Sequence, residues 1–144
     1  MTDEITYHLL GPENADRLLG AEVFDNPVDP AQLAGFVADR GHEMVFATAG
    51  VRVVGVASGR VLRHPDKQPA FFISEVGVVD DLRRRGIAST LMEMLLQIAR
   101  DKDHQGIWLA TETDNVAARA LYTRLAAQET EAVVIYDWDG AMDT

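Results

Sequence analysis

The sequence contains no cysteine, and this absence excludes several kinds of chemistry at once. Disulfides, a thiolate nucleophile and a zinc site with cysteine ligands all require that residue. The histidines do not replace it, because the four of them are scattered without the spacing of a ligand set, and we expect no metal: they are His8, His42, His64 and His104. No serine lies in a nucleophile-elbow motif, so a Ser-His-Asp triad has no support.

Basic residues and long apolar runs are also scarce. The chain has 13 lysine and arginine residues against 23 aspartate and glutamate residues, a formal net charge of −10. We therefore expect no nucleic-acid partner, whereas a cationic substrate would be attracted to such a surface. Simple solubility explains the acidity equally well. No apolar run approaches the ~18 residues of a membrane span, and residues 1–4 are polar. These features predict a cytoplasmic protein without a membrane partner.

The rest of the composition is that of an ordinary globular protein. The chain has 144 residues, of which 47% are hydrophobic, enough to bury a sizeable core. It contains no internal repeat, low-complexity tract or linker. We therefore predict one domain over residues 1–144.

Hydrophobic periodicity predicts a mixed sheet with helices packed on it, in the order β-α-α-β-β-β-α-β-α-β. Gly50 and its neighbour Ala49 predict a hairpin, and Gly55 and Gly59 predict a weakened strand or a bulge. The expected strands are 5–10, 43–49, 51–62, 71–79, 106–111 and 130–138, and the expected helices are 15–24, 30–41, 87–99 and 115–125.

The most informative stretch joins a buried strand, 71–79, to an amphipathic helix through a short basic loop. The loop reads Arg83-Arg84-Arg85-Gly86, and from residue 87 the apolar side chains fall on one helical face. Free N–H groups and the positive end of the helix dipole make such an N-terminus an anion site, for phosphate in particular. Glycine would let the ligand approach the backbone closely. The alternative is a structural loop with solvated arginines.

This loop is neither a P-loop nor a G-x-G-x-x-G loop. Its pattern, Arg83-x-x-Gly86-x-Ala88, resembles the acyl-CoA-binding motif [QR]-x-x-G-x-[AG] of the GNAT superfamily of N-acetyltransferases. The family has the same order of strands and helices, so the resemblance covers nearly the whole chain. It implies an α/β (α+β) fold with a mixed, mostly antiparallel sheet and helices on both faces.

A second pattern, Asn115-x-x-Ala118-x-x-x-Tyr122, resembles the N-x-x-A-x-x-x-Y motif of many acetyltransferases, and it begins 29 residues after Gly86. The three residues share one helical face. Taken alone, the asparagine would be a helix cap and the tyrosine a residue at the edge of the core. The family often continues with Gly-Phe where this chain has Leu-Ala-Ala at 125–127, which leaves that turn undetermined.

The resemblance implies acetyl-CoA as cosubstrate. Backbone amides near residues 76 and 78 would hold the thioester carbonyl and the pantetheine amides, and those of 83–89 would hold the pyrophosphate. The expected cosubstrate residues are Val76, Gly77, Val78, Arg83, Arg84, Arg85, Gly86, Ile87, Ala88, Ser89, Asn115 and Tyr122.

Acetylation of an amine near neutral pH requires a base, because an alkyl ammonium group has a pKa of about 10.4. Glu75 is the only acid in the strand 71–79, where the family often places a base or a water-holding carboxylate. Its apolar neighbours should raise its pKa, although an ion pair with an arginine is the alternative. Tyr122 is the candidate acid that protonates the CoA thiolate.

Four short segments of the chain resemble the aminoglycoside 3-N-acetyltransferase branch of the family. They are the strand segment 74–78 with its acid Glu75, ALYTRL at 120–125, FDNP at 24–27 and YDWD at 136–139. Aminoglycosides are polycations, so the expected acceptor-binding acids are Glu22, Asp25, Asp137 and Asp139. The last two could instead simply solvate a sheet edge. Other acceptors remain open, namely a polyamine, an amino acid or a protein N-terminus, and so does a non-catalytic CoA-binding sensor. Dimers are common in the family, so a homodimer is one possible state, but the sequence does not decide the oligomeric state.

Overall fold

The computed structural model describes residues 4–143. The chain divides into two compact units, residues 1–110 and residues 111–144. The first contains the sheet and two α-helices, and the second contains one α-helix and an irregular chain end. The prediction of one domain over the whole length stays a prediction.

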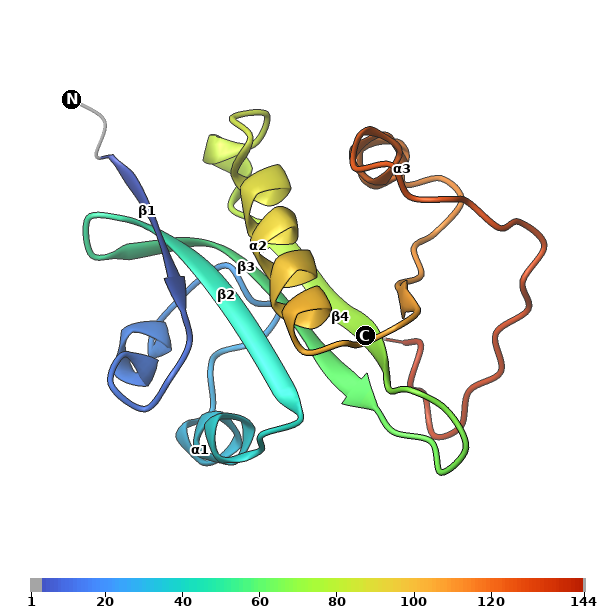
Figure 1. Cartoon of the computed structure of the whole chain (residues 1–144). Helices are drawn as coiled ribbons and strands as arrows, with labels where there is room; N and C mark the ends of the chain where they lie inside the picture. The colour runs from blue at the N-terminus through green and yellow to red at the C-terminus, as the bar shows by residue number, and fades with distance from the viewer. Residues whose placement is uncertain (1–3, 144) are drawn as a thin grey trace. The chain divides into compact units, whose positions relative to one another are not determined.

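The first unit is built on a five-stranded sheet in the order β1-β2-β3-β4-β5 (Figure 1). Its first four strands are antiparallel neighbours, and β5 runs parallel to β4. The mixed, mostly antiparallel sheet of the predicted fold is therefore confirmed. The strands are β1 (Ile5–Leu9), β2 (His42–Ala49), β3 (Arg52–Leu62), β4 (Ala70–Val78) and β5 (Ile107–Trp108).

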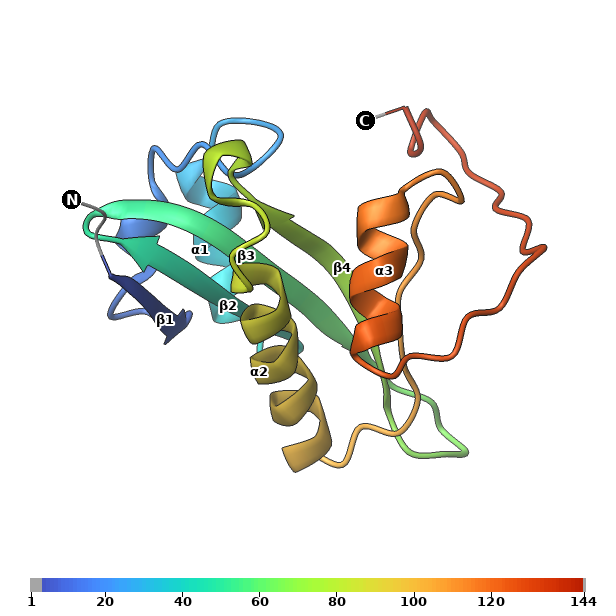
Figure 2. The same cartoon turned by 90° about the horizontal axis from the view of Figure 1, so that it is seen from above.

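Helices cover both faces of this sheet (Figures 1 and 2). The helix α2 (Ile87–Asp101) buries its apolar side against one face, where a Cβ on Gly55 would lie only 2.9 Å from Leu91. Each fully buried leucine of this kind contributes about 1.5–3 kcal/mol of stability. On the other face, α1 (Pro30–Ala38) and a 3-10 turn (Ala15–Leu18) pack on a second cluster, Leu18, Met44, Phe46, Val53 and Val56.

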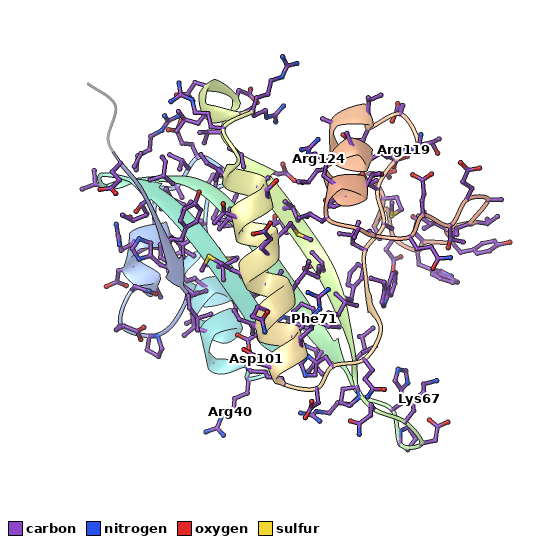
Figure 3. The ribbon with its side chains drawn as sticks, turned by 45° about the horizontal axis from the view of Figure 1, so that its top comes forward. Arg40, Lys67, Phe71, Asp101, Arg119 and Arg124 are labelled. Carbon is purple, nitrogen blue, oxygen red and sulfur yellow. The ribbon has the colours of Figure 1, made fainter. Side chains whose placement is uncertain are left out.

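The loop from β3 to β4 extends beyond the sheet, with Lys67 near its tip (Figure 3). At the start of α1, Asp29 caps the helix by accepting a hydrogen bond from the Ala31 N–H at 2.9 Å, with Pro30 at the first helical position. The predicted start of this helix is correct. No helix in the described part of the chain is long and apolar enough to cross a membrane.

Two predicted elements are wrong. The expected helix 15–24 is only one 3-10 turn, because Gly20 adopts a left-handed φ of 79° and the chain continues as bends. The expected strand 130–138 is irregular and fully exposed, and β5 is two residues long instead of six. A strand needs a hydrogen-bonded neighbour as well as β-branched residues, and sequence patterns report only the latter.

Two irregularities interrupt the ladders near the glycines that predicted them. The β2–β3 register shifts between Ala47 and Thr48, and the β3–β4 register shifts between Ser58 and Gly59. At the second shift Ser58 pairs with Glu75 and Gly59 pairs with Ile73, which leaves Ser74 of β4 without a partner. This residue is therefore a β-bulge in the central part of β4.

Candidate active site

The second half of β4 presents an unpaired backbone edge. Val79 N–H donates to the Val54 carbonyl on β3 at 2.9 Å. Because N–H groups alternate along a strand, those of Val76 and Val78 point away from β3. Within residues 4–110, β5 pairs with β4 only at 71 and 72, so it does not reach these amides. Within the first unit these two amides are therefore left unpaired, and their role in holding the cosubstrate stays a prediction.

Glu75 lies at the start of this unpaired edge, one residue after the bulge. Its pKa is raised, first by desolvation and second by the negative charge of Asp25. Glu75 remains exposed to solvent, so its carboxylate is only partly desolvated and the increase in its pKa comes from partial enclosure. Among residues 4–143 no ion pair involves it, so the alternative of a partner arginine is not what the structure contains. A raised pKa makes a carboxylate a stronger base, which suits the role of a general base.

The segment 22–26 lies beside this part of β4. The carbonyl oxygen of Val23 is 3.8 Å from the position that a Cβ on Gly77 would occupy. The same segment brings Asp25 close enough to Glu75 to raise its pKa. Of the two predicted acceptor-binding acids in the first unit, Glu22 and Asp25, it is Asp25 that acts on the candidate base.

The basic loop after β4 ends at the N-terminus of α2. A short 3-10 turn, Asp80–Leu82, leads into Arg84 and Gly86, which both have left-handed φ angles, 65° and 79°. The first bond of α2 runs from Thr90 N–H to the Gly86 carbonyl at 3.1 Å. Within the described chain, the amides at 87–89 have no hydrogen-bond acceptor, so they are free for a ligand. No atom lies within 4 Å of the Cβ position at Gly86, which leaves room for that ligand.

The three arginines of this loop are not equivalent. Arg83 pairs with Asp80 at 3.0 Å and donates from Nε to the Val78 carbonyl at 3.4 Å. Arg84 and Arg85 are exposed and form no ion pair with any residue from 4 to 143. Their guanidinium groups can turn toward a bound phosphate without breaking an internal contact.

Arg52 connects the two loops of the site, and sequence reasoning missed it. Its guanidinium binds Asp81 through two hydrogen bonds, 2.8 and 2.9 Å, and Glu22 through a third at 3.1 Å. It thereby links the segment 22–26 to the turn that leads into α2. Glu22 is held by this pair, so its predicted contact with the acceptor would have to compete with Arg52. No local motif signals such a residue, because its partners are distant in the sequence.

The second unit carries the other motif on α3 (Val116–Arg124). Asn115 caps this helix, its Oδ1 accepting from Ala118 N–H at 3.1 Å, which leaves its Nδ2 to donate elsewhere. Burial raises the pKa of Tyr122, so its phenol stays protonated well above neutral pH. The turn after α3 places Ala126 at a left-handed φ of 66°, in the position that the family often fills with glycine.

The end of the second unit is ordered by an arginine that sequence reasoning also missed. Arg119 forms two hydrogen bonds to Glu129, 2.9 and 3.0 Å, and a third to the Thr113 carbonyl at 2.8 Å. The predicted acceptor-binding residues Asp137 and Asp139 lie further along this exposed segment.

The sequence of the chain matches the model of the acetyltransferase (GNAT) family over residues 7–127. The chain therefore belongs to the acetyltransferase (GNAT) family, and this prediction is confirmed. N-acetyltransferase 8B of Rattus norvegicus is 32% identical over 98 residues, which are 66% of this chain and 43% of that protein. The chain thus spans less than half the length of that relative.

Solved structures show the same fold. An aminoglycoside acetyltransferase from an uncultured soil metagenomic sample, in complex with trehalose, superposes with a TM-score of 0.80 at 17% identity, covering 93% of this chain and 95% of that one. A ribosomal-protein-alanine N-acetyltransferase from Brucella melitensis biovar Abortus 2308 gives 0.71 at 21% identity, covering 94% and 99%. The aminoglycoside 3-N branch stays a prediction.

Proposed function

We propose that the chain is an acetyl-CoA-dependent N-acetyltransferase that acetylates a primary amine of a cationic small molecule. The preferred acceptor in this proposal is an aminoglycoside, modified at its 3-amino group. The observation that carries the proposal is the placement of Glu75. A carboxylate with a raised pKa lies on an unpaired strand edge, and that edge leads directly into a helix N-terminus with free amides.

The residues of the first unit fit acetyl-CoA in both charge and shape. The free amides at 87–89 and the unpaired Arg84 and Arg85 suit the pyrophosphate, and the amides of Val76 and Val78 suit the pantetheine arm, which can extend along β4 as a strand would. The thioester supplies an activated acetyl group. The second unit offers the Nδ2 of Asn115 as a further donor to the arm.

Glu75 is the base in this reaction. It removes a proton from the acceptor ammonium, directly or through one water, and the neutral amine nitrogen then forms its bond to the thioester carbonyl carbon. The amide of Val76 or Val78 donates to the carbonyl oxygen as negative charge develops there. The carbon–sulfur bond then breaks.

Tyr122 is the acid that completes the exchange of protons. Its phenol would give a proton to the departing CoA sulfur, and the second proton lost from the newly bonded nitrogen would return through water to the phenolate, so the products are the acetylated amine and free CoA thiol. The raised pKa of Tyr122 keeps that proton available at neutral pH.

Two lines support a cationic acceptor. The protein carries a formal charge of −10, and Asp25 adds a carboxylate beside the base. A structural neighbour is an aminoglycoside acetyltransferase, and another acetylates a ribosomal protein, so a protein N-terminus is the second candidate acceptor. Asp137 and Asp139 belong to the proposed acceptor site, and a homodimer and a cytoplasmic location stay predictions.

The test is thiol release from acetyl-CoA with separate panels of aminoglycosides, polyamines and peptides with free N-termini. Turnover with aminoglycosides alone supports the proposal, and turnover with another panel alone replaces the acceptor. Glu75→Gln should lower kcat by about 100-fold or more while acetyl-CoA affinity is unchanged, because the base acts on the amine. Glu93→Gln, on the exposed side of α2, is the matched control. Tight acetyl-CoA binding without turnover on any panel would favour the sensor function.

A further inference from the structure

Two aromatic rings stand beside the candidate base on the sheet. Phe72 of β4 and Trp108 of β5 are paired in register, and their ring centroids are 4.5 Å apart with the planes tilted by 44°. Trp108 is 51% exposed, whereas the adjacent Phe71 is 1% exposed and stacks on His104 on the opposite face. The Phe72–Trp108 pair is therefore a surface feature and not part of the core.

The bulge at Ser74 places these rings on the same face as Glu75. In a regular strand, side chains alternate, so Phe72 and Glu75 would point to opposite faces. Their partners on β3 are Arg60 and Ser58, which are two residues apart and therefore on one face. Phe72 and Glu75 are thus neighbours along that face, about 7 Å apart at the backbone.

Glu75, Phe72 and Arg60 form a strip along this face of the sheet, and the two ends of the strip differ in charge. The carboxylates of Glu75 and Asp25 lie at one end, close enough to interact. At the other end Arg60 is already engaged, donating to His42 at 2.9 Å and to Asp39 at 3.3 Å. A ligand along the strip therefore meets free negative charge at one end, and a half-exposed aromatic surface next to it.

We propose that Phe72 and Trp108 form a platform for the ring of a ring-bearing amine, whose amino group is directed to Glu75. This inference rests on the proposed acetyl transfer and adds a determinant of acceptor choice. The apolar face of a sugar or aromatic ring packs on an exposed indole, and an ammonium group needs the adjacent carboxylates. A linear polyamine has the charge but no ring, so the platform would not favour it.

The test compares Trp108→Ala with the unaltered chain, using gentamicin as the ring-bearing amine and 1,4-diaminobutane as the linear one. The variant should raise KM for gentamicin about tenfold, the effect of losing one good aromatic contact, with kcat changed by less than about twofold. Kinetic constants for the linear amine should not change. Trp108→Phe should restore most of the gentamicin affinity, and Leu9→Ala, a half-exposed residue on the far edge strand, should change neither acceptor.

Calorimetric titration of gentamicin into the CoA-loaded protein makes the result independent of turnover. A Kd that weakens about tenfold in Trp108→Ala supports the platform even if no amine is acetylated, in which case only the proposed reaction fails. Equal affinity of the two proteins for gentamicin would overturn the platform, and so would an equal loss for the ring-bearing and the linear amine. Unfolding midpoints of both variants, measured alongside, separate loss of binding from loss of folded protein.

Discussion

Both halves of β4 belong to one extended strand, but the first half lies in the core and the second half lies at the candidate active site. Residues 70–73 are paired on one side with β3, and 71 and 72 are also paired with β5, while Phe71 and Ile73 are buried. Residues 75–78 are paired with β3 alone, and they carry the candidate base and two free amides. The bulge at Ser74 separates the halves. A single unpaired residue thus divides a strand into a core segment and a functional segment, because it changes which face each later side chain meets.

Removing the bulge should have the largest effect. Insertion of one alanine between Ser58 and Gly59 of β3 gives Ser74 a partner and restores a regular ladder, in which Glu75, three residues after Phe72, moves to the opposite face, unless the first half of β4 flips and exposes Phe71 instead. We expect thiol release to fall by at least about 100-fold, with a lower unfolding midpoint.

Ser74→Ala is the control for that insertion, because it keeps the bulge and loses only a weak hydrogen bond from the Ser74 hydroxyl to the Ser58 carbonyl, 3.4 Å. It should retain activity close to that of the unaltered chain. If the insertion variant kept its activity and its unfolding midpoint, the bulge would not be what separates the halves.

The second half of β4 depends on the loop that follows it, and Gly86→Ala tests this. Alanine in the left-handed backbone conformation of Gly86 lowers the free energy of unfolding by about 1–2 kcal/mol. Its Cβ also occupies the space that a phosphate would approach. We expect acetyl-CoA affinity to fall about tenfold or more, measured by titration calorimetry, together with that loss of unfolding free energy.

Gly35→Ala is matched to this variant, since its Cβ position is equally free of neighbours but its backbone is helical. It should stabilise the chain by about 0.5–1 kcal/mol and leave acetyl-CoA affinity unchanged. Unchanged affinity in Gly86→Ala would argue against a ligand at the loop.

The smallest effect concerns the pKa of Glu75. Asp25 raises it by disfavouring a second negative charge, so Asp25→Asn should lower it. The acid limb of kcat/KM reports the free base, and we expect it to move to lower pH in this variant. The pH dependence of stability should change as well. A carboxyl group whose pKa is higher in the folded state than in the unfolded state lowers the free energy of unfolding as pH rises from the unfolded-state pKa to the folded-state pKa. Asp25→Asn should make that decrease smaller.

Asp66→Asn, in the loop between β3 and β4, removes the same charge from a residue that does not act on the pKa of Glu75, and it serves as the control. Its acid limb should coincide with that of the unaltered chain. A shift of equal size in both variants would mean that net charge, and not the neighbouring carboxylate, sets the pKa.

Local patterns were sufficient for much of this molecule. The strand at 70–78, the loop and the start of α2 follow from a switch in hydrophobic period around Gly86, and the cap at Asn115 follows from residue type. Glu75 was identified as the only acid in its strand. The two failures have different causes: the helix at 15–24 is ended by the left-handed Gly20, whereas the segment 130–138 has no neighbouring strand in the described chain, and residue types contain no information on such partners.

The sequence by itself determined the family, the order of most elements, the phosphate-type loop and the identity of the candidate base, because each depends on residues close together along the chain. Only the tertiary structure decided that Ser74 is the bulge, that Asp25 acts on Glu75, that Arg52 links two loops and that Phe72 and Trp108 share a face with the base. These facts depend on register and on contacts between distant segments, where a shift of one residue reverses the face on which a side chain lies.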